Sequence, residues 1–168
     1  RVTGVQTCAL PIWRLRLRSI FAFVVITTNA NIERHLHLPA QHGDDEILRR
    51  MNRNYSAAEY LDLLAKFRKK LPDAAVTTDL IVGFPGETDK QFENLLNFYR
   101  TANFDFAFIA KYSPRPETPA AIFPEQISAA VKKERFDRLN EMVITTTARK
   151  LAATKNRTLD ILVEKYQG

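Results

Sequence analysis

The chain has 168 residues, of which 45% are hydrophobic, and a formal net charge of +6 with a sequence pI near 9.6. This length and apolar content are typical of one soluble globular domain and exclude a disordered chain. The single cysteine excludes a disulfide framework and a cluster of thiolate metal ligands, and the apolar run Ile20–Ile26 is far shorter than the roughly 20 residues of a membrane helix. The positive charge weakly favours an anionic partner such as nucleic acid.

The first residues do not resemble a folded domain. Residues 2–12 read like the translation of a sequencing adapter, so we exclude residues 1–12, with Cys8 among them, from the fold. In residues 13–28, arginines alternate with leucines ahead of an apolar run, a pattern that fits a secretory signal, a strand or a damaged reading frame. We expect poor order there.

The next stretch predicts a short strand and two helices. The strand ends near Leu38, where Pro39 stops the ladder. Asp44 can cap a helix over residues 45–51, which has acidic residues in its first turn and basic residues in its last. The capping box Ser56–Glu59 opens a second helix that runs to about Lys70.

A strand, a glycine-rich turn and a helix follow. The apolar run Leu80–Val82 is typical of a strand buried on both faces of a parallel sheet. Gly83–Glu87 contains two glycines and a proline, which predict a tight and rigid turn. Thr88 then caps a helix that ends near Ala102. This order lets a backbone approach a nucleotide-like ligand, although an ordinary loop between strand and helix fits equally well.

The last third predicts another strand and a long helix. The strand Phe106–Lys111 precedes a loop stiffened by prolines, and Ser128 opens a helix that ends near Thr154. Residues 128–157 carry eight basic and three acidic side chains, which predicts a solvated basic face or, less often, a nucleic-acid-binding one. Leu159–Val163 predicts a final strand.

Strands that alternate with helices predict an α/β fold with parallel strands. Ligands of such folds bind at the carboxyl ends of the strands, where polar side chains follow each strand of this chain. We therefore expect five side chains to converge on one pocket: Gln41, Asp79, Glu87, Tyr112 and Arg115.

Three stretches, taken together, resemble one family. They are His35–Gln41 with Met51–Tyr55, then Thr77–Thr88, then Tyr112–Pro116. In this order and spacing they resemble the second half of the radical S-adenosylmethionine (SAM) methylthiotransferases. The most similar subfamily is MiaB, which adds a methylthio group to C2 of N6-isopentenyladenosine at position 37, beside the tRNA anticodon.

The resemblance covers residues 29–168 and implies how they are organised. Residues 29–125 would be the second half of a radical SAM (βα)6 partial barrel, with parallel strands inside and helices outside. Residues 126–157 would form a connecting helix, and residues 158–168 would be the first strand of a truncated TRAM domain. The missing amino-terminal half of the barrel would be a partner of this chain.

The family uses SAM and two [4Fe–4S] clusters. By resemblance, the cofactor-binding turn consists of Gly83, Phe84, Pro85, Gly86 and Glu87. Gln41 would lie near the ribose and methionine of SAM, and Tyr112 and Arg115 would border the cofactor or the substrate. Asp79 either faces the barrel interior or caps a neighbour. The cysteine triads of the family are absent, so we assign no catalytic or metal-binding residue to this chain and expect it to be inactive.

Two positions depart from the family pattern, because His42 replaces a serine and Glu117 replaces a glycine. We expect His42 to be structural, and the alternating His35 and His37 to serve packing and hydrogen bonding. The implied partner is the tRNA anticodon stem-loop, and the implied location is the cytoplasm, with no membrane segment. Two alternatives stay open: a sister enzyme acting on threonylcarbamoyladenosine or a ribosomal protein aspartate, and a non-catalytic RNA-binding fragment.

Overall fold

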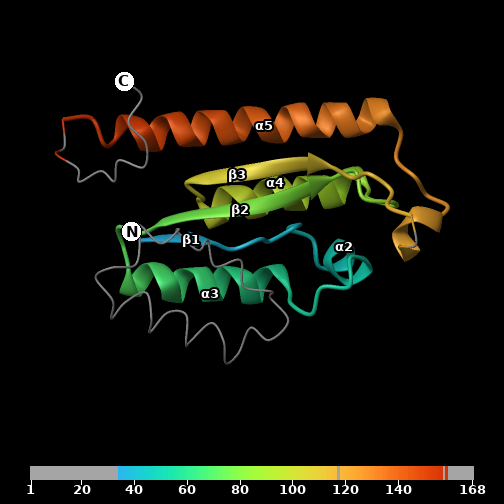
Figure 1. Cartoon of the computed structure of the whole chain (residues 1–168), viewed down its shortest axis with the longest axis horizontal. Helices are drawn as coiled ribbons and strands as arrows, with labels where there is room; N and C mark the ends of the chain where they lie inside the picture. The colour runs from blue at the N-terminus through green and yellow to red at the C-terminus, as the bar shows by residue number, and fades with distance from the viewer. Residues whose placement is uncertain (1–33, 117, 157, 159–168) are drawn as a thin grey trace, which may run out of the picture.

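A computed structural model describes residues 34–116, 118–156 and 158 of the chain (Figure 1). In chain order the elements are β1 (His35–His37), α2 (Asp45–Arg50), α3 (Ala57–Lys70), β2 (Ala75–Val82), α4 (Asp89–Ala102), β3 (Phe106–Lys111), the 3-10 helix η1 (Pro119–Ile122) and α5 (Ala129–Ala152). The expectations for residues 1–12, residues 13–28 and the strand Leu159–Val163 lie outside the described residues, as does Glu117.

The three strands form one parallel sheet in the order β1-β2-β3, as the alternation of strands and helices predicted. The register pairs His35 with Ala75 and Thr77 with Phe106. All three strands therefore end at the same edge of the sheet, and the loops that follow them meet there (Figure 1). This is the arrangement expected for part of a radical SAM barrel.

Each α-helix in the described residues begins at a residue whose side chain accepts a hydrogen bond from a backbone N–H group of the first turn. Asp44 accepts hydrogen bonds from the amides of Glu46 and Ile47, and Ser56 and Glu59 form the predicted capping box. Thr88 forms a second capping box with Gln91 at the start of α4. The predicted starts of these helices were confirmed. They could be predicted because a capping residue lies directly beside its helix in the sequence.

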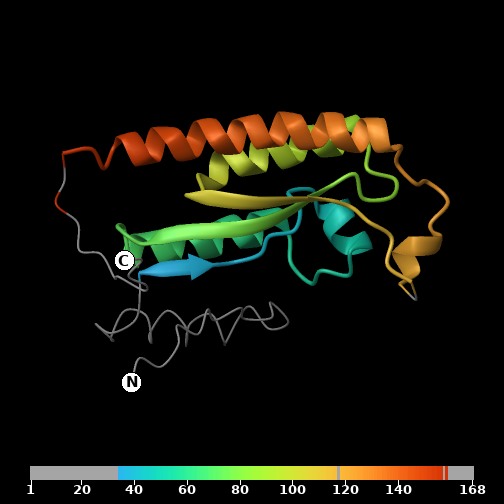
Figure 2. The same cartoon turned by 45° about the horizontal axis from the view of Figure 1, so that its top comes forward.

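The core lies on one side of the sheet. Helices α3 and α4 cover that side, and α5 runs along β3 beside α4 (Figures 1 and 2). The aromatic side chains of Tyr60, Phe67, Phe92, Tyr99 and Phe104 are fully buried there, together with Leu139 and Val143 of α5. We call this side the helix face of the sheet.

The expectation that Leu80–Val82 is buried on both faces was wrong. Burial along β2 alternates, so that Leu80 and Val82 are buried on the helix face whereas Ile81 on the other side is half-buried. On β3, Phe106 and Phe108 lie on the same side as Ile81 and are 39% and 57% exposed. The helices cover one face of the sheet in the described part of the chain, and we call the second side the open face.

Helix α5 was expected to present a solvated basic face, and three of its basic residues do not fit that description. Arg135 is buried, and the ammonium groups of Lys132 and Lys150 donate to the carbonyl oxygens of Tyr112 and Asn103. These cations hold α5 against the sheet. Among the described residues, no helix combines the length and the apolar character needed to cross a membrane.

A pair of phenylalanines can test the one-sided core. Phe104 is fully buried and its ring lies 5.9–6.1 Å from those of Tyr60, Phe98 and Tyr99. We predict that Phe104→Ala lowers the free energy of unfolding by about 3–5 kcal/mol. The matched change Phe108→Ala on the open face should cost less than about 1 kcal/mol. Urea denaturation followed by circular dichroism measures both, and equal losses would contradict a one-sided core.

Candidate functional site

The Gly83–Glu87 turn joins the end of β2 to α4 at the carboxyl edge of the sheet. Gly83 and Gly86 have φ angles of 71° and 75°, a backbone region that side chains with a Cβ rarely adopt. A Cβ on Gly83 would come within 2.4 Å of the Lys132 Cγ, and one on Gly86 within 2.2 Å of an Arg50 nitrogen. The predicted role of both glycines in a tight turn was confirmed.

The carboxylate of Glu87 is buried inside this turn. Its Oε2 accepts hydrogen bonds from the amides of Gly83 and Phe84. The amide of Gly86 donates to the carbonyl of Glu125, and that of Glu87 donates to the carbonyl of Phe84. Since Pro85 has no N–H, every amide of the turn is already used. The carbonyl of Glu87 accepts from Arg135, so the backbone offers the carbonyl oxygens of Gly83, Pro85 and Gly86. Such acceptors suit ligands with N–H or O–H donors better than phosphates.

The turn is packed from three sides. The Phe84 ring lies 5.1 Å from that of Tyr112 and 6.3 Å from that of Phe123, in edge-to-face geometry. Arg50 of α2 lies over the Phe123 ring at 5.3 Å and pairs with Glu125 at 2.8 Å. Gly83, Phe84, Pro85 and Glu87 are buried as a result.

Gln41 follows β1 and joins the same edge. Its amide donates to the carbonyl of Asp79, and its own carbonyl accepts from the amide of Ile81, with a φ of 66°. The side-chain Oε1 lies 3.3 Å from an Arg53 nitrogen. Gln41 is thereby fixed against the last residues of β2, one strand away from the start of the turn.

Asp79 lies on the open face of the sheet. Its Oδ2 is 3.3 Å from His37 Nε2, while the Thr77 hydroxyl lies 2.9 Å from His37 Nδ1 and 2.8 Å from His35 Nε2. The two histidines point the same way and take part in hydrogen bonding, as their alternation predicted. A carboxylate accepts, so His37 Nε2 carries the proton when this bond forms, and Thr77 donates to Nδ1.

Tyr112 and Arg115 follow β3 and have different surroundings. The amide of Tyr112 donates to the carbonyl of Val82 and its ring lies 5.1 Å from the Lys132 ammonium, so Tyr112 borders the turn. Arg115 is exposed in the proline-rich loop, where its carbonyl accepts from Thr118. The structure thus brings Gln41, the turn and Tyr112 to one edge, and places the carboxylate of Asp79 on the open face and Arg115 on the surface.

His42 is fully buried behind the turn. Its Nδ1 accepts from the amide of Asp44 at 3.0 Å, which places the proton of the neutral ring on Nε2, 3.9 Å from Glu87 Oε1. Nearby, the Tyr55 hydroxyl donates to the carbonyl of Ala40 at 2.9 Å, and burial raises the pKa of Tyr55 to about 12. These contacts support a structural role for His42.

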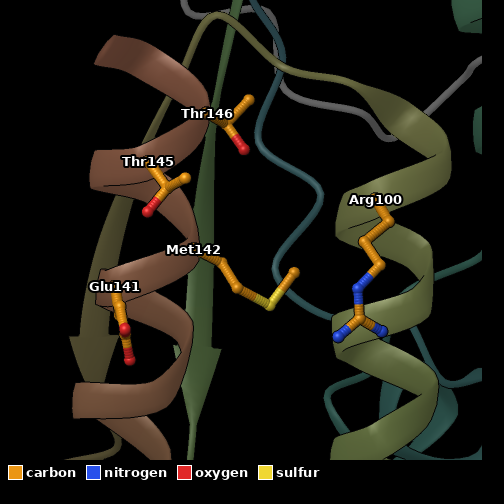
Figure 3. A pocket seen from close by; sticks show the side chains of 5 residues that line it. All are labelled: Arg100, Glu141, Met142, Thr145 and Thr146. Atoms are coloured by element: carbon orange, nitrogen blue, oxygen red, sulfur yellow. The ribbon is translucent and has the colours of Figure 1, made fainter. Parts of the chain in front are cut away.

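Within residues 34–116, 118–156 and 158, no three His, Cys, Asp or Glu side chains gather as metal ligands. A shallow hollow lies between α4 and α5, where Met142 projects toward Arg100 and Glu141, Thr145 and Thr146 line the α5 side (Figure 3). Arg100 lies near the carboxyl end of α4, so this hollow is about 18 Å along the helix from the Gly83–Glu87 turn.

Sequence reasoning missed the cations that surround the turn. Arg135 and Lys132 come from α5, and Arg50 comes from α2. No local pattern marks them, since each reads as an ordinary basic residue of a helix surface. Only the fold brings them to the turn.

Comparisons with known proteins agree with this geometry. Residues 28–99 match the family model described as the Radical SAM superfamily. The tRNA-2-methylthio-N(6)-dimethylallyladenosine synthase of Geobacillus kaustophilus (strain HTA426) is 46% identical over 140 residues, which are 83% of this chain and 26% of that protein. This chain is related to the radical SAM methylthiotransferases.

Further relatives carry the same name. The protein of Geobacillus thermodenitrificans (strain NG80-2) is 46% identical over 83% of this chain and 27% of its own length. That of Bacillus subtilis (strain 168) is 43% identical over 83% of this chain and 28% of its own length. The resemblance inferred from three motifs is confirmed. The chain spans about a quarter of the length of these curated relatives.

Gly86 allows a direct test of the turn. We predict that Gly86→Ala costs about 1–2 kcal/mol of unfolding free energy because of the left-handed backbone. Displacing the end of the flexible Arg50 side chain from its ion pair with Glu125 should add up to about 1 kcal/mol. In an Arg50→Ala background only the backbone cost remains, so the same substitution should be cheaper. Urea denaturation of the four chains measures this difference, and equal losses in both backgrounds would contradict the close contact.

Proposed function

We propose that this chain is part of a tRNA methylthiotransferase that adds a methylthio group to C2 of N6-isopentenyladenosine at position 37. The observation that carries the proposal is the 43–46% identity to synthases of 2-methylthio-N(6)-dimethylallyladenosine, another name for the methylthio product of this nucleoside. The glycine-rich turn at the carboxyl edge of a parallel sheet supports it, because ligands of such folds bind there.

The residues at this edge fit SAM by the chemistry that they offer. The amides of the turn and the carbonyls of Phe84 and Glu87 are used internally, and the carbonyl oxygens of Gly83, Pro85 and Gly86 remain for a donor ligand. The adenine amino group and the α-ammonium group of SAM are such donors. We assign the binding of SAM to Gly83, Phe84, Pro85, Gly86 and Glu87, with Gln41 and Tyr112 beside them. One SAM molecule, reduced by an iron–sulfur cluster that this chain does not supply, would provide the radical that starts the reaction, and a second SAM molecule would provide the methyl group.

Asp79 and Arg115 complete the proposed set of cofactor-binding residues, although they lie farther from the Gly83–Glu87 turn. Asp79 is held by His37 on the open face, which in a closed barrel would be the interior, so its carboxylate would accept from a donor of the cofactor or the substrate. Arg115 is exposed and could reach the phosphates of the tRNA anticodon stem-loop or the edge of the cofactor. A tRNA-modifying enzyme acts where tRNA is, so we also propose a cytoplasmic location.

The residues of this chain do not fit an iron–sulfur cluster. A [4Fe–4S] cluster needs several thiolates, whereas the 168 residues contain one cysteine. We predict that the chain, after anaerobic reconstitution with iron and sulfide, holds much less than one cluster per molecule and shows no methylthio transfer. Iron and sulfide analysis measures the first quantity, and stoichiometric cluster binding would contradict the prediction.

A chimera tests the proposed function itself. The matching segment of the Geobacillus kaustophilus relative is replaced by residues 29–168 of this chain, in cells that lack their own methylthiotransferase. We expect 2-methylthio-N6-isopentenyladenosine in digested tRNA, measured by mass spectrometry. Gly83→Val should lower its amount at least tenfold, because the turn cannot accommodate a branched Cβ at a φ of 71°.

Ile122→Ala provides the control, because Ile122 is 85% exposed and belongs to η1 rather than to the turn. This variant should make as much product as the parent chimera. A chimera that folds and carries its clusters but leaves the tRNA unmodified would contradict the proposed function.

A further inference from the structure

The carboxylate of Glu87 determines the shape of the Gly83–Glu87 turn. Its Oε2 binds two consecutive amides, while its Oε1 has no hydrogen-bond partner within the protein. The side chain is fully buried. A buried carboxylate needs a nearby positive charge, because burial otherwise penalises the charged form. The group that supplies this charge holds the Glu87 carboxylate in place and thereby stabilises the shape of the turn.

Arg135 of α5 supplies it. Its Nη1 lies 3.5 Å from Glu87 Oε1 and donates to the Glu87 carbonyl at 2.9 Å, while its Nη2 donates to Asp89 at 2.7 Å. The guanidinium lies 5.6 Å from the centre of the Phe92 ring, and the residue is 3% exposed. Arg135 therefore contacts the last residue of the turn and the first residue of α4 with a single planar group.

The other end of the turn is held by the same helix. Lys132 lies three residues before Arg135, on the same side of α5. Its aliphatic stem occupies the space where a Cβ of Gly83 would lie, and its ammonium donates to the Tyr112 carbonyl at 3.0 Å. Helix α5 thus contacts the beginning and the end of the turn, although it lies more than 40 residues later in the sequence.

We propose that Arg135 is a positioning residue: through Glu87 it holds the Gly83–Glu87 turn in the shape that receives the ligand. The role requires the fork geometry of a guanidinium and not merely a positive charge, because one group binds the Glu87 carbonyl, the Glu87 carboxylate and Asp89. The part of this inference that concerns the ligand rests on the proposed function, whereas the part that concerns the turn does not.

Amide hydrogen exchange of the ¹⁵N-labelled 168-residue chain tests the effect on the turn. In Arg135→Met we expect the amides of Gly83 and Phe84 to exchange at least tenfold faster and their resonances to shift. The amide of Leu38, which donates to the Thr77 carbonyl in the sheet, serves as the reference. Exchange that accelerates at Gly83 and Phe84 but not at Leu38 marks a loosened turn, whereas general unfolding would accelerate all three.

Arg138→Met is the matched control, because Arg138 lies on the same helix and pairs with Glu93 and Glu134 at the surface. It should leave the Gly83 and Phe84 amides unchanged. Arg135→Lys keeps the charge and most of the volume, and should accelerate exchange at the turn less than Arg135→Met does. If Arg135→Met does not fold, the exchange rates of the Gly83 and Phe84 amides in Arg135→Lys test the proposal. Wild-type exchange at Gly83 and Phe84 in a folded Arg135 variant would overturn the proposal.

S-adenosylhomocysteine, which cannot react, tests the effect on the ligand by titration of the same samples. We expect the dissociation constant to rise at least fivefold in Arg135→Met and to stay unchanged in Arg138→Met. Equal affinity in both variants would overturn the ligand part. If the wild-type chain does not bind this probe at all, the assignment of the SAM-binding turn fails, while the exchange data still decide whether Arg135 positions the turn.

Discussion

The candidate site depends on one buried carboxylate. Glu87 binds the amides of Gly83 and Phe84, and this closes the loop between β2 and α4 into a turn of fixed shape. The other two amides of the turn donate to the carbonyls of Glu125 and Phe84, so no amide is free. This separates the turn from the phosphate-binding loops that it resembles in composition. The same glycine-rich pattern can therefore serve opposite kinds of ligand chemistry, according to which side chain occupies the amides.

A second constraint is that the positive charge beside the Glu87 carboxylate comes from a residue far away in the sequence. The positive charge comes from Arg135, so the long helix α5 that follows the sheet is part of the candidate site and not merely a connection. The basic composition of α5 acquires a different meaning in this light. Several of its cations face the protein, where they bind carbonyl oxygens and a carboxylate, and are not available to an external anion.

What the sequence could predict was local. The caps Asp44, Ser56 and Thr88 lie next to the helices that they start, and the strand Phe106–Lys111 is bounded by its own turn signals, so these were confirmed. The burial of Ile81 was not predictable, because an apolar run does not reveal whether one or two faces are covered. The role of Arg135 was not predictable either, since its partner lies 48 residues away.

The two faces of the sheet carry different kinds of side chain. The large side chains that stabilise the fold, such as Phe92 and Phe104, lie on the helix face. The side chains of His37, Asp79 and Phe108 project from the three strands onto the open face, and their replacement removes little from the core. A protein built in this way can change what it recognises on one surface while the opposite surface preserves its architecture, which gives related enzymes room to diverge in substrate without losing the fold.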